Sequence, residues 1–420
     1  MTEKREIKGF WWTPDKPEYR VFGILTLELG EGAQLVTFAE GGFTAEAFDP
    51  NNQVIHGQDE HAKPVTLLFV MPPRPTISGG LMQRSFHVGY VVFGIALPDS
   101  SSFIAHELQL WIQHFHGWAG TTGFVDDSEL KEETTIRYRH PDEVYYRISD
   151  DLEVGIGVSM HAQHGLWDRG IKENAWISFR SKAGFSFHRS FKLLDAVRLL
   201  LHFAILKPVY PVEISVEKEG HGYSLGDRWI KQTISLWGSI LREPKSEYPF
   251  DAARWVFQLK DFGNAFSTRF TDWLDYVERY HEALGCYSST IYHSLTHELT
   301  HLSLTQALDA YHGQKHQSHK NQDFKAKIQE LATPHTTSLA GLVDDVPAFV
   351  EQVQATRNFY THHNPKWKAT GKVAEKADLY RLNEKLRLLF QMCVLTDIKI
   401  PADRFSRLRH QLATHIIDFQ

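Results

Sequence analysis

The sequence predicts an α+β protein of two domains, in which a β-rich domain precedes an all-helical one. The main observation is that the spacing of apolar residues changes along the chain. In the first part they alternate in short runs rich in β-branched and aromatic residues, whereas in the second they recur every three or four residues. The length of 420 residues is also typical of two domains. We therefore expect domains at residues 1–245 and 246–420.

Several runs in the first domain have the composition of strands. Residues 19–29 alternate and end at a glycine-rich turn at 30–32, which predicts a hairpin. Further strands are expected at 65–70, 86–97, 134–139, 144–160, 176–187 and 212–216. Two helices should interrupt them, one at 190–206 and one at 103–115, because apolar residues recur there at helical spacing.

The helical pattern begins after the polar segment that ends at Lys245. The expected segments are an apolar stripe at 266–277, a second at 291–311, a polar connector at 312–327, and helices at 340–363 and 374–396. Pro347 predicts a kink in the first of these two helices, because its ring removes a backbone donor. The second domain is therefore expected to be a helical bundle.

Composition restricts the class of protein. The net charge is −6, which excludes a globally basic nucleic-acid coat protein, so an RNA site would have to be a local basic patch. The two cysteines exclude a disulfide scaffold or a zinc ribbon and fit a reducing compartment. The N-terminus has no apolar signal core, and the most apolar window, 193–212, contains Asp195, Arg198 and His202. We expect a cytoplasmic protein without a membrane segment.

The most informative stretch is the pattern Arg-x4-His formed by Arg357, Asn358 and His362. An imidazole can move a proton to or from a 2′-hydroxyl or a leaving oxygen. A guanidinium can bind the phosphate bidentately and stabilise the charge of the transition state. Pro365 should end the helix near His362, where the helix dipole favours a protonated imidazole. These residues predict phosphodiester cleavage without a metal or another cofactor.

The three side chains do not meet on one helix. Asn358 and His362 are four residues apart and share a face, but Arg357 lies about 140° from His362 around the helix axis. A fraying helix end or a second copy of the motif could complete the site. The alternative is a helix end with ordinary polar residues, because Arg-x4-His often occurs by chance.

Cations are concentrated around this motif. Between residues 357 and 381 there are six Lys or Arg side chains, opposed only by Glu375 and Asp378. Trp367 and Tyr360 could stack on bases while lysines hold the backbone. The side chains expected to bind RNA are Lys366, Trp367, Lys368 and Lys372. A solvated lysine-rich loop would have the same composition.

Two other motifs compete with this interpretation. His297-Glu298-x-x-His301 has the spacing of a zinc peptidase, in which both imidazoles bind the ion and the carboxylate is the general base. A third ligand is missing at the expected positions, and His293 extends the row in a straight line, so a row of packed or interface histidines is the alternative. The segment 222–226 matches G-x-S-x-G, but a turn between strands is expected there, because no helical pattern follows it.

The order of several short motifs resembles the ApeA-type antiphage proteins over nearly the whole chain. In the N-terminal half these are KGFWWTP at 8–14, VFGIL at 21–25, VIHGQ at 54–58, PVTLL at 64–68 and LQLW at 108–111. The C-terminal half resembles the matching HEPN domain in LSLTQALDAYH at 302–312 and TRNFYTHH at 356–363. This resemblance implies a helical domain that forms homodimers or higher homo-oligomers, so that two motifs face one cleft and cut RNA without a metal.

The resemblance also implies roles for individual residues. It gives Arg357, Asn358 and His362 the catalytic positions. Tyr360, which lies within the motif, is a further candidate for a supporting role. Asp309 stands where the family often has Glu, and it either orients Arg357 or forms a structural pair. Host RNA, with transfer RNA as an attractive target, is the implied substrate in abortive phage defence. A HEPN module that only dimerises or binds nucleotides is the remaining alternative, which the retained motif argues against.

The N-terminal domain is expected to regulate the second domain. An unrestrained ribonuclease would harm its host, so something must hold it inactive. We expect the β-rich domain to recognise a phage product, such as a phage protein, and to relieve this inhibition.

Overall fold

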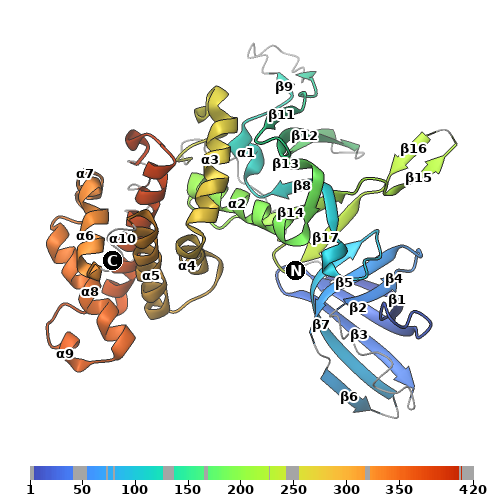
Figure 1. Cartoon of the computed structure of the whole chain (residues 1–420), viewed down its shortest axis with the longest axis horizontal. Coiled ribbons are helices and arrows are strands. Elements are labelled where there is room, and N and C mark those ends of the chain that lie inside the picture. The colour runs from blue at the N-terminus through green and yellow to red at the C-terminus, as the bar shows by residue number, and fades with distance from the viewer. Residues whose placement is uncertain are drawn as a thin grey trace. The chain divides into compact units, whose positions relative to one another are not determined.

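The chain in the computed structural model divides into two compact units (Figure 1). Unit 1 comprises Met1–Arg198 and Val209–Pro249, and unit 2 comprises Leu199–Pro208 and Phe250–Gln420. The residues that the structure describes are 4–40, 54–71, 74–78, 81–125, 137–164, 169–226, 228–242, 255–316, 322–405 and 408. Strands dominate the first part of the chain and helices the second, which confirms the predicted fold class. The boundary expected near residue 245 lies outside the described residues.

Antiparallel strands form a closed barrel in unit 1. The ring closes because one part of β7 pairs with β3 and another part pairs with β5. The barrel strands, in order, are β7 (Leu81–Phe93), β3 (Gly32–Glu40), β2 (Val21–Glu28), β1 (Lys4–Trp12), β4 (Val54–Gln58) and β5 (Pro64–Val70). Alternate side chains point inward, and Ile7, Trp11 and Phe86 belong to the apolar core that they form.

An open antiparallel sheet continues from β7. Its further strands, in order, are β17 (Ile234–Gly238), β14 (Pro211–Glu217), β8 (Ile104–Ile112), β13 (Arg169–Ser186), β12 (Glu153–His164) and β11 (Val144–Arg147). Smaller elements of unit 1 are β6 (Arg74–Ser78), a 3-10 turn (Ser100–Ser102), α1 (Phe115–Ala119), the pair β9 (Phe124–Val125) and β10 (Arg137–Tyr138), and the hairpin β15 (Gly222–Leu225) and β16 (Arg228–Lys231).

One secondary-structure prediction in unit 1 is wrong. Residues 103–115 do not form a helix, because most of them form β8, which pairs with β13 on one side and β14 on the other. Leu108, Leu110 and Ile112 are all buried at the two-residue spacing of a strand. The helical spacing of the larger apolar residues conceals this period, and sheet pairing on both sides decides the conformation.

The other predictions for unit 1 are largely confirmed. The turn at 30–32 joins β2 directly to β3, and the helix expected at 190–206 is α2 (Phe187–Ile205). The strand expected at 144–160 is two strands, β11 and β12, which pair with each other. Of the strand expected at 134–139, the first three residues lie outside the described part of the chain.

Unit 2 is a bundle of helices, and it includes the last residues of α2, from Leu199 onward. Its other helices are α3 (Phe266–Arg279), α4 (His281–Tyr292), α5 (His297–Lys315), α6 (Phe324–Ala332), α7 (Thr336–Leu339), α8 (Val346–His362), α9 (Pro365–Lys368) and α10 (Lys376–Asp397). Short 3-10 turns lie at Leu259–Asp261, Gly263–Ala265, Thr333–His335 and Ala402–Arg404. Every residue of α10 from 388 to 395 is buried, so this helix forms the centre of the bundle.

Some helices begin or end at other residues than the sequence predicts, because of helix caps and breaks. The helix expected at 340–363 begins only at Val346, where Asp345 accepts a hydrogen bond from the N–H of Ala348 at 3.0 Å. Pro347 therefore occupies the first turn, where its missing donor is harmless, and does not kink the helix. The stripe at 291–311 spans a break between α4 and α5. Among the described residues, no helix is long and apolar enough to cross a membrane.

Candidate functional site

The last turn of α8 exposes His362. The helix ends there because His363 adopts a left-handed conformation with φ of 48°, and its N–H donates to the carbonyl of Phe359. Asn364 then caps α9, since its Oδ1 accepts a hydrogen bond from the N–H of Lys366 at 3.0 Å. The side chain of His362 is thus held in the last turn of the helix and is exposed to solvent.

Arg357 lies on a different side of the same helix. Its guanidinium carbon is 4.4 Å from the centre of the Phe324 ring at the start of α6, a cation–π contact. Asn358 shares the face of His362, as the helical period requires. Within the described parts of the chain, no carboxylate pairs with Arg357 and no hydrogen bond engages His362. One chain therefore presents the cation and the imidazole on different faces of α8.

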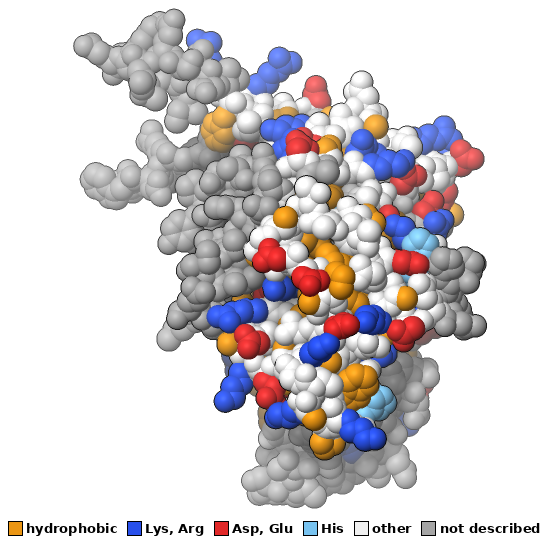
Figure 2. All heavy atoms as spheres, turned by 90° about the vertical axis from the view of Figure 1, so that its left-hand side faces the viewer, with side chains coloured by type: hydrophobic (Ala, Val, Ile, Leu, Met, Phe, Trp, Pro, Cys, Tyr) orange, Lys and Arg blue, Asp and Glu red, His pale blue; other side chains and the backbone are white. Residues whose placement is uncertain are grey.

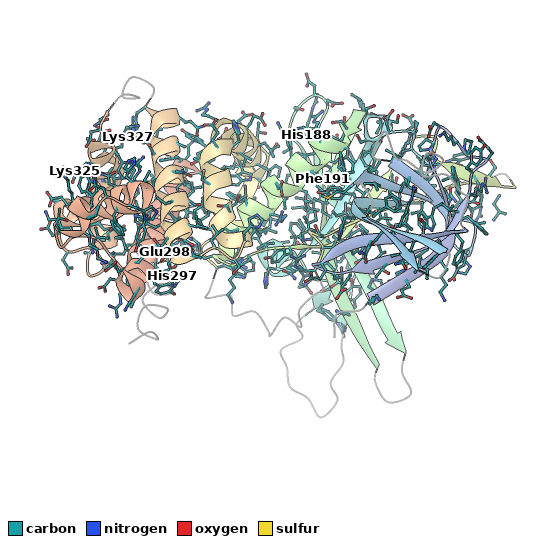
Figure 3. All side chains as sticks on the ribbon, turned by 90° about the horizontal axis from the view of Figure 1, so that it is seen from below. His188, Phe191, His297, Glu298, Lys325 and Lys327 are labelled. Atoms are coloured by element: carbon teal, nitrogen blue, oxygen red, sulfur yellow. The ribbon has the colours of Figure 1, made fainter. Side chains whose placement is uncertain are left out.

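Asp309 of α5 contacts a lysine. Its Oδ1 lies 2.7 Å from Nζ of Lys327, whose side chain is mostly buried on α6. Figure 3 shows Lys327 and Lys325 on this helix. Two roles were considered for Asp309, and this geometry supplies the structural pair. Among the described residues, Asp309 forms its ion pair with Lys327 and no hydrogen bond or ion pair with Arg357.

Two of the four side chains expected to bind RNA are already ion-paired. Lys368 Nζ lies 2.6 Å from a Glu375 carboxylate oxygen, and Lys372 pairs with Glu351. Glu351 also accepts from Lys325 at 2.9 Å. The hydrogen bond from Lys372, followed by that from Lys325, lowers the pKa of Glu351 to about 2. These lysines would have to exchange a carboxylate for a phosphate in order to bind RNA.

The other two side chains expected to bind RNA are less constrained by neighbouring residues. The side chain of Lys366 is exposed and that of Trp367 is half-buried. The Tyr360 hydroxyl donates to the carbonyl of Ala374 at 3.3 Å, and burial raises the pKa of Tyr360. Figure 2 shows acidic and basic side chains interspersed on this side of the molecule. Any RNA site here therefore depends on a few positions and not on a uniformly positive field.

The His297-Glu298-x-x-His301 motif does not have the geometry of a zinc site. His297 and Glu298 are exposed at the beginning of α5 (Figure 3). His301 is 0% exposed, and its Nδ1 lies 3.0 Å from Oδ1 of Asn383 on α10. His293 belongs to the extended segment after α4 and does not continue the row. No three His, Cys, Asp or Glu side chains gather at one point in the described parts of the chain.

The G-x-S-x-G match is also not a nucleophile elbow. Residues Gly222–Leu225 form β15, and Ser224 pairs with Trp229 across the hairpin. The turn follows at Gly226, which has a φ of 59°, so the predicted turn between strands lies at the end of the motif. An elbow requires a strand that runs directly into a helix, and β15 is followed by another strand.

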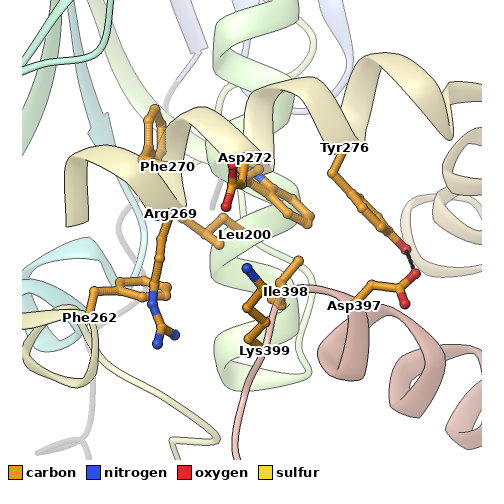
Figure 4. Close-up of a pocket in the computed structure, with 10 residues that line it drawn as sticks. Leu200, Phe262, Arg269, Phe270, Asp272, Tyr276, Asp397, Ile398 and Lys399 are labelled. Atoms are coloured by element: carbon orange, nitrogen blue, oxygen red, sulfur yellow. Dashed lines mark hydrogen bonds between the residues drawn. The ribbon is translucent and has the colours of Figure 1, made fainter. Parts of the chain in front are cut away.

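A small cavity in unit 2 has a structural role. Its volume is about 40 Å³, too small for a nucleotide, and Asp397 and Tyr276 lie on its wall (Figure 4). Asp397 accepts hydrogen bonds from the hydroxyls of Tyr276 at 3.4 Å and Tyr311 at 2.5 Å, and it pairs with Lys315 at 2.7 Å. These contacts join α3, α5 and α10, and burial raises the pKa of both tyrosines.

The sequence did not predict the contacts made by Phe324, Asn383 and His301. Phe324 contacts the Arg357 guanidinium, and Asn383 bonds to His301. One feature of the sequence could have indicated Asn383, because it is a polar residue next to Leu382 on the apolar face of α10. A polar residue at a buried helix position usually has a specific partner.

Two family models together cover most of the chain. The model described as ApeA N-terminal domain 1 matches residues 6–273. The model described as Apea-like HEPN matches residues 275–404, a segment that contains the whole of α5 to α10. No curated protein and no solved structure matches the chain. The motif helix and its neighbours thus lie within the HEPN match.

Proposed function

Because this chain belongs to the ApeA-type HEPN family, whose paired domains are those of an antiphage effector, we propose that it is a metal-independent endoribonuclease that cleaves host RNA during phage infection. The observation that carries this proposal is the end of α8. There one Arg-x4-His motif supplies both groups. The imidazole of His362 is exposed, and no carboxylate among the described residues pairs with the guanidinium of Arg357.

Each motif residue has a role in the proposed reaction. His362, which is exposed, transfers a proton to or from the 2′-hydroxyl or the leaving oxygen. Arg357 binds the phosphate and stabilises the charge that develops on it. Asn358, on the face of His362, can donate its amide hydrogens to the same phosphate. Together these groups supply proton transfer and charge stabilisation from side chains.

The proposed site is composite. Arg357 and His362 point to different faces of α8, so one copy of the motif does not surround a phosphate. In a homodimer, the Arg of one copy and the His of the other can meet across a shared cleft. Lys366 and Trp367 would hold the RNA strand, joined by Lys368 and Lys372 once they leave their carboxylates. A single-stranded loop, such as that of a transfer RNA, exposes bases for this kind of stacking.

The test is cleavage of total cellular RNA by the full chain in excess EDTA. Wild type should cleave in EDTA, and His362→Ala should lower the rate at least about 100-fold, since general acid–base catalysis contributes that much or more. His363→Asn is the matched control, because His363 is the exposed neighbour and asparagine tolerates its left-handed backbone. The control should cleave like wild type.

Cleavage that requires a metal and does not depend on His362 would contradict the proposal. Because the enzyme is expected to be held inactive before infection, the assay is also run with extract from phage-infected cells. Cleavage should then appear or increase in wild type and in His363→Asn alone. The same RNA pattern from all three proteins would likewise contradict the proposal.

Unit 1 is proposed to sense the phage product. Support comes from the β15–β16 hairpin, in which Tyr223, Leu225 and Trp229 are 48%, 65% and 54% exposed. Trp229 and Lys231 also line a hollow of about 920 Å³ whose other walls carry side chains of both charges. Exposed apolar groups beside a polar rim are typical of protein-binding surfaces.

If the hairpin contacts a phage protein, Trp229→Ala should reduce activation by infected-cell extract at least about tenfold, as expected for an exposed aromatic anchor. Activity without extract and thermal unfolding should stay close to wild type, because Trp229 lies on an exposed hairpin and is more than half exposed. The measurement is the ratio of RNA cleavage with and without extract. An unchanged ratio in Trp229→Ala and in Leu225→Ser would remove the hairpin from the sensing surface.

A further inference from the structure

The carboxylate of Glu351 on α8 holds two lysines that come from different elements. Lys325 belongs to the first turn of α6, and its Nζ lies 2.9 Å from one carboxylate oxygen of Glu351. Lys372 belongs to the connector, residues 369–375, that joins α9 to α10, and it pairs with the other carboxylate oxygen. Two cations that converge on one carboxylate form an arrangement that can also hold a phosphate group, because lysine pairs with either anion.

All three side chains of this cluster are open to solvent. The side chains of Lys325, Glu351 and Lys372 are 42%, 39% and 52% exposed. The other lysine labelled on α6 in Figure 3, Lys327, is different, because its side chain is only 10% exposed in its pair with Asp309. A ligand in solution can therefore reach Lys325 and Lys372, whereas Lys327 is enclosed.

The backbone that carries each lysine is held in place by contacts that do not involve the carboxylate. On α6, Asp323 caps the helix by accepting a hydrogen bond from the N–H of Lys325 at 3.2 Å. In the connector, the N–H of Ala374 donates to the buried hydroxyl of Thr356 at 3.0 Å. The carbonyl of Ala374 accepts from the hydroxyl of Tyr360, one turn further along α8, at 3.3 Å. The connector is thus fixed on the motif helix, and the lysines stay close together without the carboxylate.

The cluster lies next to the motif arginine. Phe324, which precedes Lys325 on α6, contacts the guanidinium of Arg357. Glu351 and Arg357 are six residues apart on α8, which is a rise of about 9 Å along the helix axis. An RNA strand that is bound at Arg357 can therefore place a nearby phosphate at the two lysines.

The carboxylate of Glu351 remains charged throughout the physiological pH range. The hydrogen bonds from Lys372 and then from Lys325 lower its pKa to about 2. Protonation therefore does not release the two lysines. Another anion can release them by competition, and a nucleic-acid backbone supplies one negative charge at every nucleotide.

We propose that Lys325 and Lys372 form a phosphate subsite for the RNA strand, and that Glu351 fills this subsite in the free protein as an autoinhibitory contact. RNA binds there only by displacing the carboxylate, so Glu351 lowers the affinity of the protein for RNA. This inference rests on the proposed function in one respect, namely that RNA is the ligand of the surface around the motif.

The test is the binding of a fluorescent single-stranded RNA of about 12 nucleotides, within the usual length of such binding sites. Its 2′-hydroxyls are methylated, so the full chain can bind this RNA but has no nucleophile to activate in it. Glu351→Gln preserves the shape of the side chain and removes its charge. This variant should bind the RNA roughly 3- to 10-fold more tightly than wild type, because two exposed ion pairs no longer have to be broken. The measurement is fluorescence anisotropy at one fixed salt concentration.

Two further proteins separate the subsite from a general change in charge. A triple variant that combines Lys325→Gln and Lys372→Gln with Glu351→Gln should lose the gain in affinity. Glu217→Gln is the matched control, because Glu217 of β14 pairs with Lys231 at 2.7 Å and its side chain is about as exposed as that of Glu351. This control changes the net charge equally, and it should bind RNA like wild type.

Unchanged or weaker binding by Glu351→Gln would overturn the inference, and so would an equal gain in Glu217→Gln. A gain that persists in the triple variant would also overturn it, because the two lysines would then not be the subsite. Failure of the proposed function is distinguishable from these results. In that case unmethylated RNA stays uncut by every protein, while Glu351→Gln still binds the methylated RNA more tightly than wild type does.

Discussion

Replacing Arg357 with alanine is expected to lower the rate of RNA cleavage roughly 100- to 1000-fold, because one preorganised donor to a transition-state oxyanion typically contributes that much. Arg357→Lys should recover little of this loss. Lysine keeps the charge, but it has neither the planar fork that binds two phosphate oxygens nor the flat face that lies 4.4 Å from the centre of the Phe324 ring. The measurement is kcat and KM on one RNA in EDTA.

The chain offers a matched control for this substitution. Arg269 of α3 also lies over an aromatic ring, with its guanidinium carbon 5.6 Å from the centre of the Phe262 ring, but it belongs to no motif. Arg269→Ala should cleave RNA like wild type, and the two alanine variants should unfold at similar temperatures. Equal activity in Arg357→Ala and Arg269→Ala would show that the motif arginine is not part of the site. Full activity in Arg357→Lys would rule out a bidentate grip.

The fold class and the motif helix could be predicted from the sequence because both depend on local patterns. The change of apolar period along the chain identified the β-rich and helical parts, and the α8 motif lies on a helix that ends where Pro365 predicted. The error at 103–115 has a different origin. Strand β8 is determined by its partners β13 and β14, which are distant in sequence, and its local spacing favours the wrong structure.

The surroundings of the motif could not be predicted for the same reason. The hydrogen bond between His301 and Asn383 joins residues 82 positions apart, and that between Lys372 and Glu351 spans 21. Counting cations between 357 and 381 therefore overestimated the positive charge available to RNA, because Glu351 lies outside that window. Asp309 was predicted as a possible partner of Arg357, but its carboxylate pairs with Lys327 of α6. Such pairings depend on how helices pack, which local patterns do not determine.

Mixed dimers provide the second large expected effect. If the site is composite, Arg357→Ala and His362→Ala chains are each inactive alone but complement each other. A heterodimer of the two has one intact site, made of the Arg from one chain and the His from the other, and one site that lacks both. Purification through both tags removes the two homodimers, and each heterodimer that remains has one of two sites, so activity per dimer should recover to about half that of wild type. The measurement is cleavage by variants co-expressed with different affinity tags and purified through both tags in turn.

The outcome depends on the geometry of α8. Arg357 contacts Phe324 on one side of the helix, whereas His362 is exposed at its end, so a complete site within one chain would require the helix end to unwind. The control is Arg357→Ala paired with a chain that carries both substitutions, which has no intact combination and should stay inactive. Recovery in the first pair alone assigns the cation and the imidazole to different chains. Purified heterodimers without activity would instead mean that both groups act from the same copy, and the last turn of α8 would then have to open before RNA is cut.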